Sequence, residues 1–164
     1  MKGKKTNLWP LLLALLAVIL LSPSPYAATG KDDEVAMWAE ETLLATLSLD
    51  YASETERLEE TRKNYTLNAW KAIHGFLGNY MEKVLTDQLI LHPAPISPPV
   101  IVKSGIVTKS NFFAGVPYWV IQQPIAIPEL SITIDFIVVV IELKQKNQYI
   151  IQSLNMSIKN SSPM

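Results

Sequence analysis

Few residues in this chain have the types and spacings that carry catalysis or bind a metal. His74 and His92 are the only histidines, and neither has a second histidine or a carboxylate at the spacing of a zinc-binding helix. The chain has no cysteine, which excludes a disulfide scaffold, a thiolate metal site and a cysteine nucleophile. No phosphate-binding loop or nucleophile-elbow motif occurs. The sequence therefore predicts no catalytic residue, no metal ligand and no cofactor.

Carboxylates are the remaining candidates for chemistry. Glu40-Glu41 and Glu59-Glu60 are adjacent pairs, but neighbouring residues on a helix point in different directions, so we interpret both pairs as solvated faces. Asp135 lies within an apolar strand, where a buried carboxylate needs a partner or a shifted pKa. The structural alternative places Asp135 on the half-exposed side of that strand, near its start.

Two roles are possible for the tryptophans Trp38, Trp70 and Trp119. Together with Asp135 they would line a pocket for a small ligand. Alternatively, they anchor the core where helices meet a sheet. A deep enclosed pocket in the structure favours the first reading, and a filled core favours the second.

The N-terminus has the three zones of a secretory signal peptide. Three lysines precede an apolar run of 14 residues, 8–21, and a Ser-Pro-Ser-Pro segment separates this run from Ala27-Ala28. Cleavage after Ala28 would place Tyr26 where a small residue is preferred, so an uncleaved inner-membrane anchor remains the alternative. In both cases the domain lies in the periplasm, because the positive end stays inside.

Charge is divided unevenly along the chain. Residues 29–92 hold 6 basic and 12 acidic residues, whereas residues 93–164 hold 5 basic and 3 acidic ones. No basic stripe with interleaved aromatic residues occurs, which argues against nucleic-acid binding. An acidic first half suits a protein partner better.

The first half of the mature chain has helical periodicity. Apolar residues recur at spacings of three and four from Val35 to Leu47. A capping box, Ser53-Glu54-Thr55-Glu56, predicts the start of a second, solvated helix that is anchored by Leu58. Thr66 is positioned to cap a third helix whose apolar face extends to Val84.

The second half of the chain has the pattern of strands. A proline-rich stretch leads into a short strand at 100–102, and residues 116–127 follow as a second strand, broken by Pro124 and closed by Pro128. Residues 132–143 alternate clearly and are apolar on both faces in the middle, which predicts a central strand. Residues 149–159 form the last strand. Helices first and strands afterwards indicate a segregated α+β fold with an antiparallel sheet.

Several short motifs resemble the periplasmic domain of the DotI/IcmL family of type IVB secretion proteins and their conjugation relatives. They are Asp50-Tyr51, Tyr65-Thr66 with Trp70, the Pro-Val-Ile run at 99–101, Gly105-Ile106-Val107, and the segment from Tyr118-Trp119 to Pro124. The resemblance covers about residues 35–158. Ala69 stands where the family has glycine. The N-terminus resembles a cleavable leader rather than a full membrane span, which suggests an IcmL-like paralogue.

The resemblance implies a cystatin-like, nuclear-transport-factor-like roll, with N-terminal helices packed on a curved four-stranded antiparallel sheet. It also implies a non-enzymatic component whose partners are secretion-system subunits and a second copy of itself. From exposure and charge, we expect the protein-interaction surface on the acidic second helix, at Glu56, Arg57, Glu59 and Glu60. The expected domain plan is a leader at 1–28, a linker at 29–33, the periplasmic domain at 34–160 and a loose tail at 161–164.

Three functions compete at this point. The first is a structural or assembly subunit of a type IV secretion or conjugation system. The second is a small-ligand binder or an enzyme built on the same roll, with its site at Asp135 and the tryptophans. The third is a free periplasmic factor that acts elsewhere after its leader is removed. Localisation and partners separate the first from the third.

Overall fold

A computed structural model describes residues 30–52, 54–109, 114–143 and 148–160. The expected leader at 1–28 and tail at 161–164 lie outside this range. The elements are three helices, α2 (Gly30–Leu47), α3 (Glu54–Arg62) and α4 (Leu67–Thr86), followed by strands β1 (Ala94–Pro95), β2 (Val100–Ile106), β3 (Pro117–Ile127), β4 (Ile132–Leu143) and β5 (Gln148–Asn160), with a 3-10 turn, η1 (Pro128–Leu130), between β3 and β4. The α+β class predicted from the order of helices and strands is confirmed.

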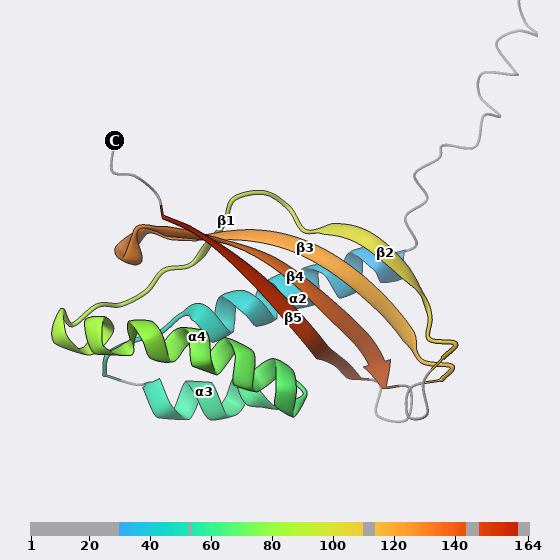
Figure 1. The fold of residues 1–164 in the computed structure, drawn as a ribbon, viewed down its shortest axis with the longest axis horizontal. Coiled ribbons are helices and arrows are strands. Elements are labelled where there is room, and N and C mark those ends of the chain that lie inside the picture. Colours follow the sequence, from blue (N-terminus) through green and yellow to red (C-terminus); the bar gives the residue numbers. More distant parts are fainter. Residues whose placement is uncertain (1–29, 53, 110–113, 144–147, 161–164) are drawn as a thin grey trace, which may run out of the picture.

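One curved antiparallel sheet covers the helices (Figure 1). Its order is β1-β3-β4-β5, and β2 also pairs with β3. β1 pairs with residues 125–126 of β3 and β2 pairs with residues 117–122, so the two short strands share one edge. The five strands therefore occupy four positions, and the expected four-stranded roll has an interrupted first strand.

The prediction that Pro124 breaks its strand was wrong. β3 runs without interruption from Pro117 to Ile127, and Pro124 pairs with Asp135 of β4. The Pro124 carbonyl accepts a hydrogen bond from the Ile96 N–H at 3.0 Å, on the side of the edge strands. The nitrogen of a strand residue points to the same side as its carbonyl, so the missing donor of Pro124 faces the gap between β1 and β2. A proline is tolerated here because the neighbouring strand is interrupted.

β4 is the central strand, as predicted. It pairs along its full length with β3 on one side and with β5 on the other. Its even-numbered residues from Ile132 to Val140 face the helices and are buried, and they form the middle of the core with Phe136 fully enclosed. Burying one such side chain contributes about 1.5–3 kcal/mol.

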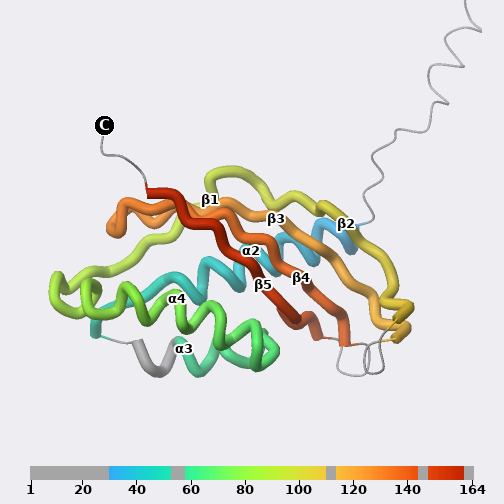
Figure 2. Tube along the Cα trace, in the orientation of Figure 1, coloured from blue at the N-terminus to red at the C-terminus, as the bar shows by residue number. Residues whose placement is uncertain are grey.

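Helix α2 lies on one face of the sheet and crosses behind the strands in Figure 2. Its inward face consists of small and branched apolar residues at helical spacing: Val35, Ala39, Leu43 and Leu47. These residues pack against the buried faces of β3 and β4, including Ile121 and Val138. The helix begins at Gly30, so residues 30–33, which we expected to be a linker, form its first turn.

The N-terminal end of α2, residues 31–34, is fastened to three strands. The Lys31 ammonium contacts both oxygens of Glu142 at 2.7 and 2.8 Å, and the Trp119 indole N–H donates to the Asp32 carboxylate at 2.7 Å. The Tyr149 hydroxyl donates to the Glu34 carboxylate at 3.0 Å. These contacts reach β4, β3 and β5 in turn and fix the start of the helix against the sheet.

The predicted cap of the third helix is confirmed. The Thr66 hydroxyl accepts from the Ala69 N–H at 3.4 Å and donates to the Gln152 carbonyl at 2.7 Å. The main chain on either side bonds to β5, with Thr66 N–H to Ile151 O at 3.0 Å and Ile151 N–H to Asn64 O at 2.9 Å. The start of α4 thus covers part of the β5 edge of the sheet.

Within the described residues, no helix has the length and apolar character needed to span a membrane.

Candidate interaction surface

The outer face of α3 is the interaction surface predicted from the sequence. Nine residues form this helix, and Leu58 is its buried anchor against the core. The side chains of Glu59 and Glu60 are exposed, as expected. The side chains of Glu56 and Arg57 lie outside the described part of the chain, so their place on this surface remains a prediction.

The exposed carboxylates of α3 have local basic partners. Glu59 lies 3.8 Å from Arg62, and Glu60 lies 3.9 Å from Lys63. Each of these glutamates pairs with the basic residue three positions further along the helix. Exposed pairs of this kind contribute about 0.2–1 kcal/mol. The helix therefore carries charges of both signs, and its weak ion pairs can be replaced by ion pairs with a partner protein.

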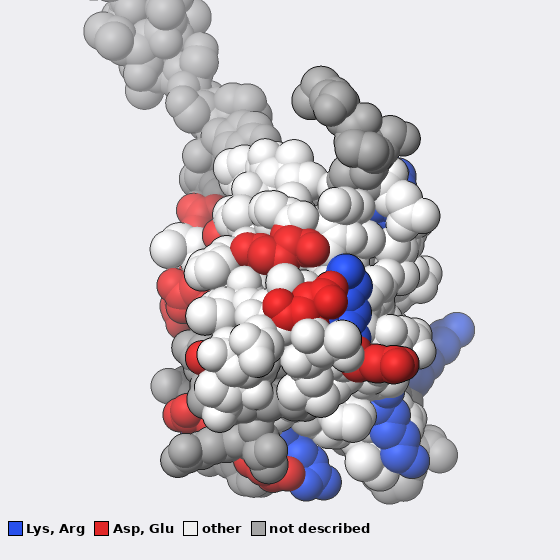
Figure 3. Space-filling model, turned by 90° about the vertical axis from the view of Figure 1, so that its left-hand side faces the viewer, with Lys and Arg blue, Asp and Glu red and all other residues white. Residues whose placement is uncertain are grey.

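Acidic side chains extend beyond α3 onto the end of the domain where α2 and α4 finish. Viewed from that end, acidic patches spread over the surface with a few basic patches beside them (Figure 3). Lys83 and Asp87 form an exposed pair at 2.7 Å near the end of α4. This distribution agrees with the acidic balance of residues 29–92.

Asp135 takes the half-exposed position of the two that we considered. It lies on the face of β4 that points away from the helices, and its carboxylate pairs with the Lys159 ammonium at 2.6 Å. Trp119 lies on the opposite, buried face of the sheet and bonds to Asp32. Trp70 stacks with Tyr65 at the start of α4, with ring centroids 5.7 Å apart. Trp38 and Trp119 both contact the Tyr149 ring, but Asp135 and Trp70 lie elsewhere, so the expected ligand site is not assembled.

Neither histidine lies in a metal-binding arrangement. His74 is exposed on α4 and contacts the Trp70 ring. The His92 Nδ1 lies 2.8 Å from a Glu129 oxygen, and the His92 backbone N–H donates to the other oxygen at 3.2 Å. Burial acts to raise the pKa of the Glu129 carboxyl, but these hydrogen bonds outweigh it and lower the pKa. Across the described residues, no group of three His, Asp or Glu side chains is placed to hold a metal ion.

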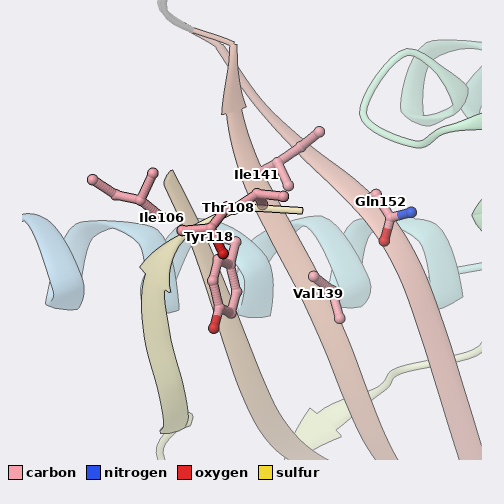
Figure 4. A pocket seen from close by; sticks show the side chains of 7 residues that line it. Ile106, Thr108, Tyr118, Val139, Ile141 and Gln152 are labelled. Atoms are coloured by element: carbon pink, nitrogen blue, oxygen red, sulfur yellow. The ribbon is translucent and has the colours of Figure 1, made fainter. Parts of the chain in front are cut away.

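Hollows lined by described residues open to solvent. One of about 420 Å³ lies on the sheet face away from α2, where Tyr118, Val139, Ile141 and Gln152 point into it (Figure 4). A second, of about 560 Å³, adjoins Trp38 and Tyr149, and a third, of about 410 Å³, lies beside the loop at 95–99. Their open form suits contact with another macromolecule better than enclosure of a small ligand.

Sequence reasoning missed the outward face of α2. Asp33, Glu34, Glu40 and Glu41 lie three or four residues from Met37, so all four carboxylates surround one exposed methionine. The spacing is readable in the sequence. The signal is the placement of two acidic pairs one turn before and one turn after Met37.

Residues of the short motifs mostly have structural roles. The Asp50 carboxylate accepts from the Ala52 N–H at 2.9 Å and Asp50 bridges to Ile90, while the Tyr65 hydroxyl lies 2.8 Å from the Thr46 hydroxyl inside the core. Burial, in spite of that hydrogen bond, raises the pKa of Tyr65 far above its usual range. Asp50 thus ties the end of α2 to the segment after α4, and Tyr65 ties the start of α4 to the core and to β5.

Comparison with known families gives one sequence match that spans most of the chain. Residues 17–150 match the model of the DotI/IcmL family, described as a type IVB secretion system inner-membrane complex component. Among curated proteins, no sequence matches the chain.

Three solved structures share the fold. An IcmL-like type IV secretion system protein from Legionella pneumophila has 18% identity and a TM-score of 0.62, covering 87% of this chain and 98% of that one. The periplasmic domain of DotI has 16% identity and a TM-score of 0.61, with coverage of 83% and 96%. A periplasmic fragment of TraM has 10% identity and a TM-score of 0.60, with coverage of 77% and 96%.

Proposed function

Because the chain belongs to the DotI/IcmL family of type IVB secretion inner-membrane complex components, we propose that it is a non-enzymatic assembly subunit of such a secretion or conjugation system. It acts in the periplasm through protein–protein contacts, after export by the N-terminal leader or while anchored by it. Its partners are other subunits of the apparatus and a second copy of itself.

The observation that carries this proposal is the match of a family model to residues 17–150, combined with a surface made for contact rather than catalysis. The described residues bring together no metal-binding group, and the candidate ligand site at Asp135 is not assembled. The hollows are open, and the exposed helices carry charged side chains. Such a surface recognises a partner by shape and charge.

We assign the contact with secretion-channel subunits to the outer face of α3, centred on Glu59 and Glu60 and extended by Glu56 and Arg57. α3 reaches the core through Leu58, and its remaining described side chains are available to a partner. Replacing its exposed ion pairs with pairs across an interface loses little, because each internal pair contributes at most about 1 kcal/mol.

Affinity purification from cross-linked native cells tests the proposal. A C-terminally tagged chain should recover secretion-channel subunits, and Glu59→Lys/Glu60→Lys should reduce that recovery by about tenfold, as expected when an interface loses one or two charge contacts. Glu82→Lys, an exposed reversal on α4, is the matched control and should leave recovery unchanged. A wild-type chain that recovers no subunit refutes the assembly role. Full recovery with the α3 variant refutes only the assigned surface.

A further inference from the structure

Met37 stands at the centre of a negatively charged face of α2. Its side chain is 59% exposed, although methionine is usually buried. Asp33 and Glu34 lie one turn before it and Glu40 and Glu41 one turn after it. One helix face therefore presents an apolar side chain inside a ring of four carboxylates, which we call the Met37 ring.

The charge of this ring is not neutralised within the described part of the chain. Asp33, Glu40 and Glu41 take part in no ion pair there, and Glu34 accepts a hydrogen bond only from the neutral Tyr149 hydroxyl. The nearby Lys31 is committed to Glu142 on the sheet. Four like charges within two helical turns repel one another, and a cationic partner relieves that repulsion.

Two hollows adjoin the Met37 ring and meet at Met37. The hollow of about 560 Å³ is lined by Trp38 and Tyr149 together with Asp33, Glu34 and Glu41. The hollow of about 410 Å³ lies on the other side, between Glu40 and the loop at 95–99, where Ile96 is 55% exposed. The apolar floor is thus continuous from the aromatic rings across Met37 to Ile96.

The aromatic hollow is suited to a guanidinium or ammonium group. The Trp38 and Tyr149 ring centroids lie 5.5 Å apart and tilted, and the carboxylates of Glu34 and Glu41 line the same hollow. A cation over an aromatic ring gains from the ring's negative face, and arginine adds hydrogen bonds to a carboxylate. Burial, followed by the hydrogen bond to Glu34, raises the pKa of Tyr149 to about 12, so its hydroxyl remains neutral beside such a cation.

We propose that the Met37 ring and its two hollows bind a basic amphipathic helix of another protein. The partner places apolar side chains against Met37 and Ile96 and arginine or lysine side chains against the carboxylates. The two carboxylate pairs are seven residues apart, about 10.5 Å along α2, so a parallel or antiparallel partner helix matches them with basic residues at positions i and i+7. Anionic lipid head groups and nucleic acids are repelled by the same charges.

This surface is separate from the one assigned to α3. Its failure would leave the assembly role intact, and its success does not depend on that role.

Peptide binding to the purified full-length chain in non-ionic detergent tests the proposal. The probe is a fluorescent 16-residue helical peptide of alanine and glutamine with arginine at positions 4 and 11 and leucine at 7 and 8. Its anisotropy should report saturable binding that weakens at least about tenfold between low salt and 0.3 M salt, because screening shortens the reach of exposed charges. The same peptide with glutamate for arginine should not bind.

Variants locate the site. Glu40→Lys/Glu41→Lys should weaken binding of the arginine peptide at least tenfold, whereas Glu59→Lys/Glu60→Lys, an adjacent pair on α3, should bind like the wild type. Asp33→Asn/Glu41→Gln removes charge at nearly constant shape, and it should weaken binding even if the reversal variant fails to fold. Equal binding by all variants overturns the proposal. So does self-association of the chain that Glu40→Lys/Glu41→Lys alone abolishes, because a second copy is then the occupant.

Discussion

α2 and α3 both expose adjacent glutamates, yet their surroundings differ. α3 lies at the periphery, and each described glutamate on it has a basic partner one turn away. α2 has its inner face in the core and residues 31–34 fastened to three strands, while the carboxylates of its outer face have no basic partner among the described residues. The two helices therefore expose the same residue type in different states: paired on α3, and without a basic partner among the described residues on α2.

This contrast has an energetic side. A rigid helix presents its side chains without a large ordering cost on binding, whereas a peripheral helix gives up conformational freedom when it is docked. α2 is accordingly suited to recognising one defined partner shape, and α3 to exchanging its internal ion pairs for pairs with a partner.

The largest difference between the two helices should appear in stability. Leu43→Ala on α2 removes a fully buried side chain and should lower the free energy of unfolding by about 2–5 kcal/mol. Leu58→Ala on α3 removes a side chain that is 9% exposed and should cost less than Leu43→Ala. Urea unfolding of the full chain, followed by circular dichroism, measures both. Equal losses would show that α3 is as firmly packed as α2.

The next largest loss of stability should come from breaking the contact between the first turn of α2 and the sheet. Glu142→Gln removes charged contacts to Lys31 at 2.7 and 2.8 Å from a nearly buried carboxylate and should cost about 1–2 kcal/mol. Lys83→Gln removes an exposed pair with the same 2.7 Å separation and should cost at most about 0.5 kcal/mol. Denaturant midpoints of the two variants provide the comparison. A costlier Lys83 variant would contradict the role given to the first turn.

Neutral substitutions on the outer faces of α2 and α3 should change the stability of the fold in opposite directions. Glu59→Gln breaks an ion pair and should lower stability by a few tenths of a kcal/mol. Glu41→Gln removes repulsion within the Met37 ring and should leave stability unchanged or raise it by a similar amount. Thermal unfolding at low and at high salt measures both, since salt should reduce each effect. The same sign for both variants would remove the distinction between paired and unpaired carboxylates.

The smallest expected effect is the contribution of Glu129 to the pH dependence of stability. The pKa of Glu129 is lower in the folded chain than in the unfolded one, so its contribution to stability is present above the unfolded pKa and is lost as pH falls through the folded pKa. Glu129→Gln should therefore reduce stability at pH 7 but have little effect near pH 3. Urea midpoints at both pH values test this. A variant that loses as much stability at pH 3 as at pH 7 would show that the His92 contact acts without the carboxylate charge.

Much of the fold could be predicted because it follows from local pattern. The alternation of residues 132–143 gave the central strand, and the Thr66 hydroxyl gave the start of α4. The continuity of β3 through Pro124 could not be predicted, because it depends on a gap in a neighbouring strand that only the assembled sheet reveals. Gln123 shows the same limit: its buried amide donates to the Ser97 carbonyl in that gap, a contact 26 residues away in sequence.

The surfaces were predictable in part. Exposure of Glu59 and Glu60 followed from composition, and their pairing with Arg62 and Lys63 required the helix to be placed. The first turn of α2 was expected to be a linker because the contacts that order it reach residues more than 80 positions away. The hollows beside Met37 likewise depend on Tyr149 and the loop at 95–99, which lie far from α2 in sequence.

The most direct test of the assembly account is quantitative recovery of secretion-system subunits from cross-linked native cells. Four tagged chains are compared: the wild type, Glu40→Lys/Glu41→Lys, Glu59→Lys/Glu60→Lys, and the combination of all four changes. The account predicts that the wild type recovers channel subunits, that the α3 pair lowers their yield about tenfold, that the α2 pair removes a different, basic partner, and that the combined variant shows both losses independently. A wild-type chain purified without any secretion-system subunit would contradict the account.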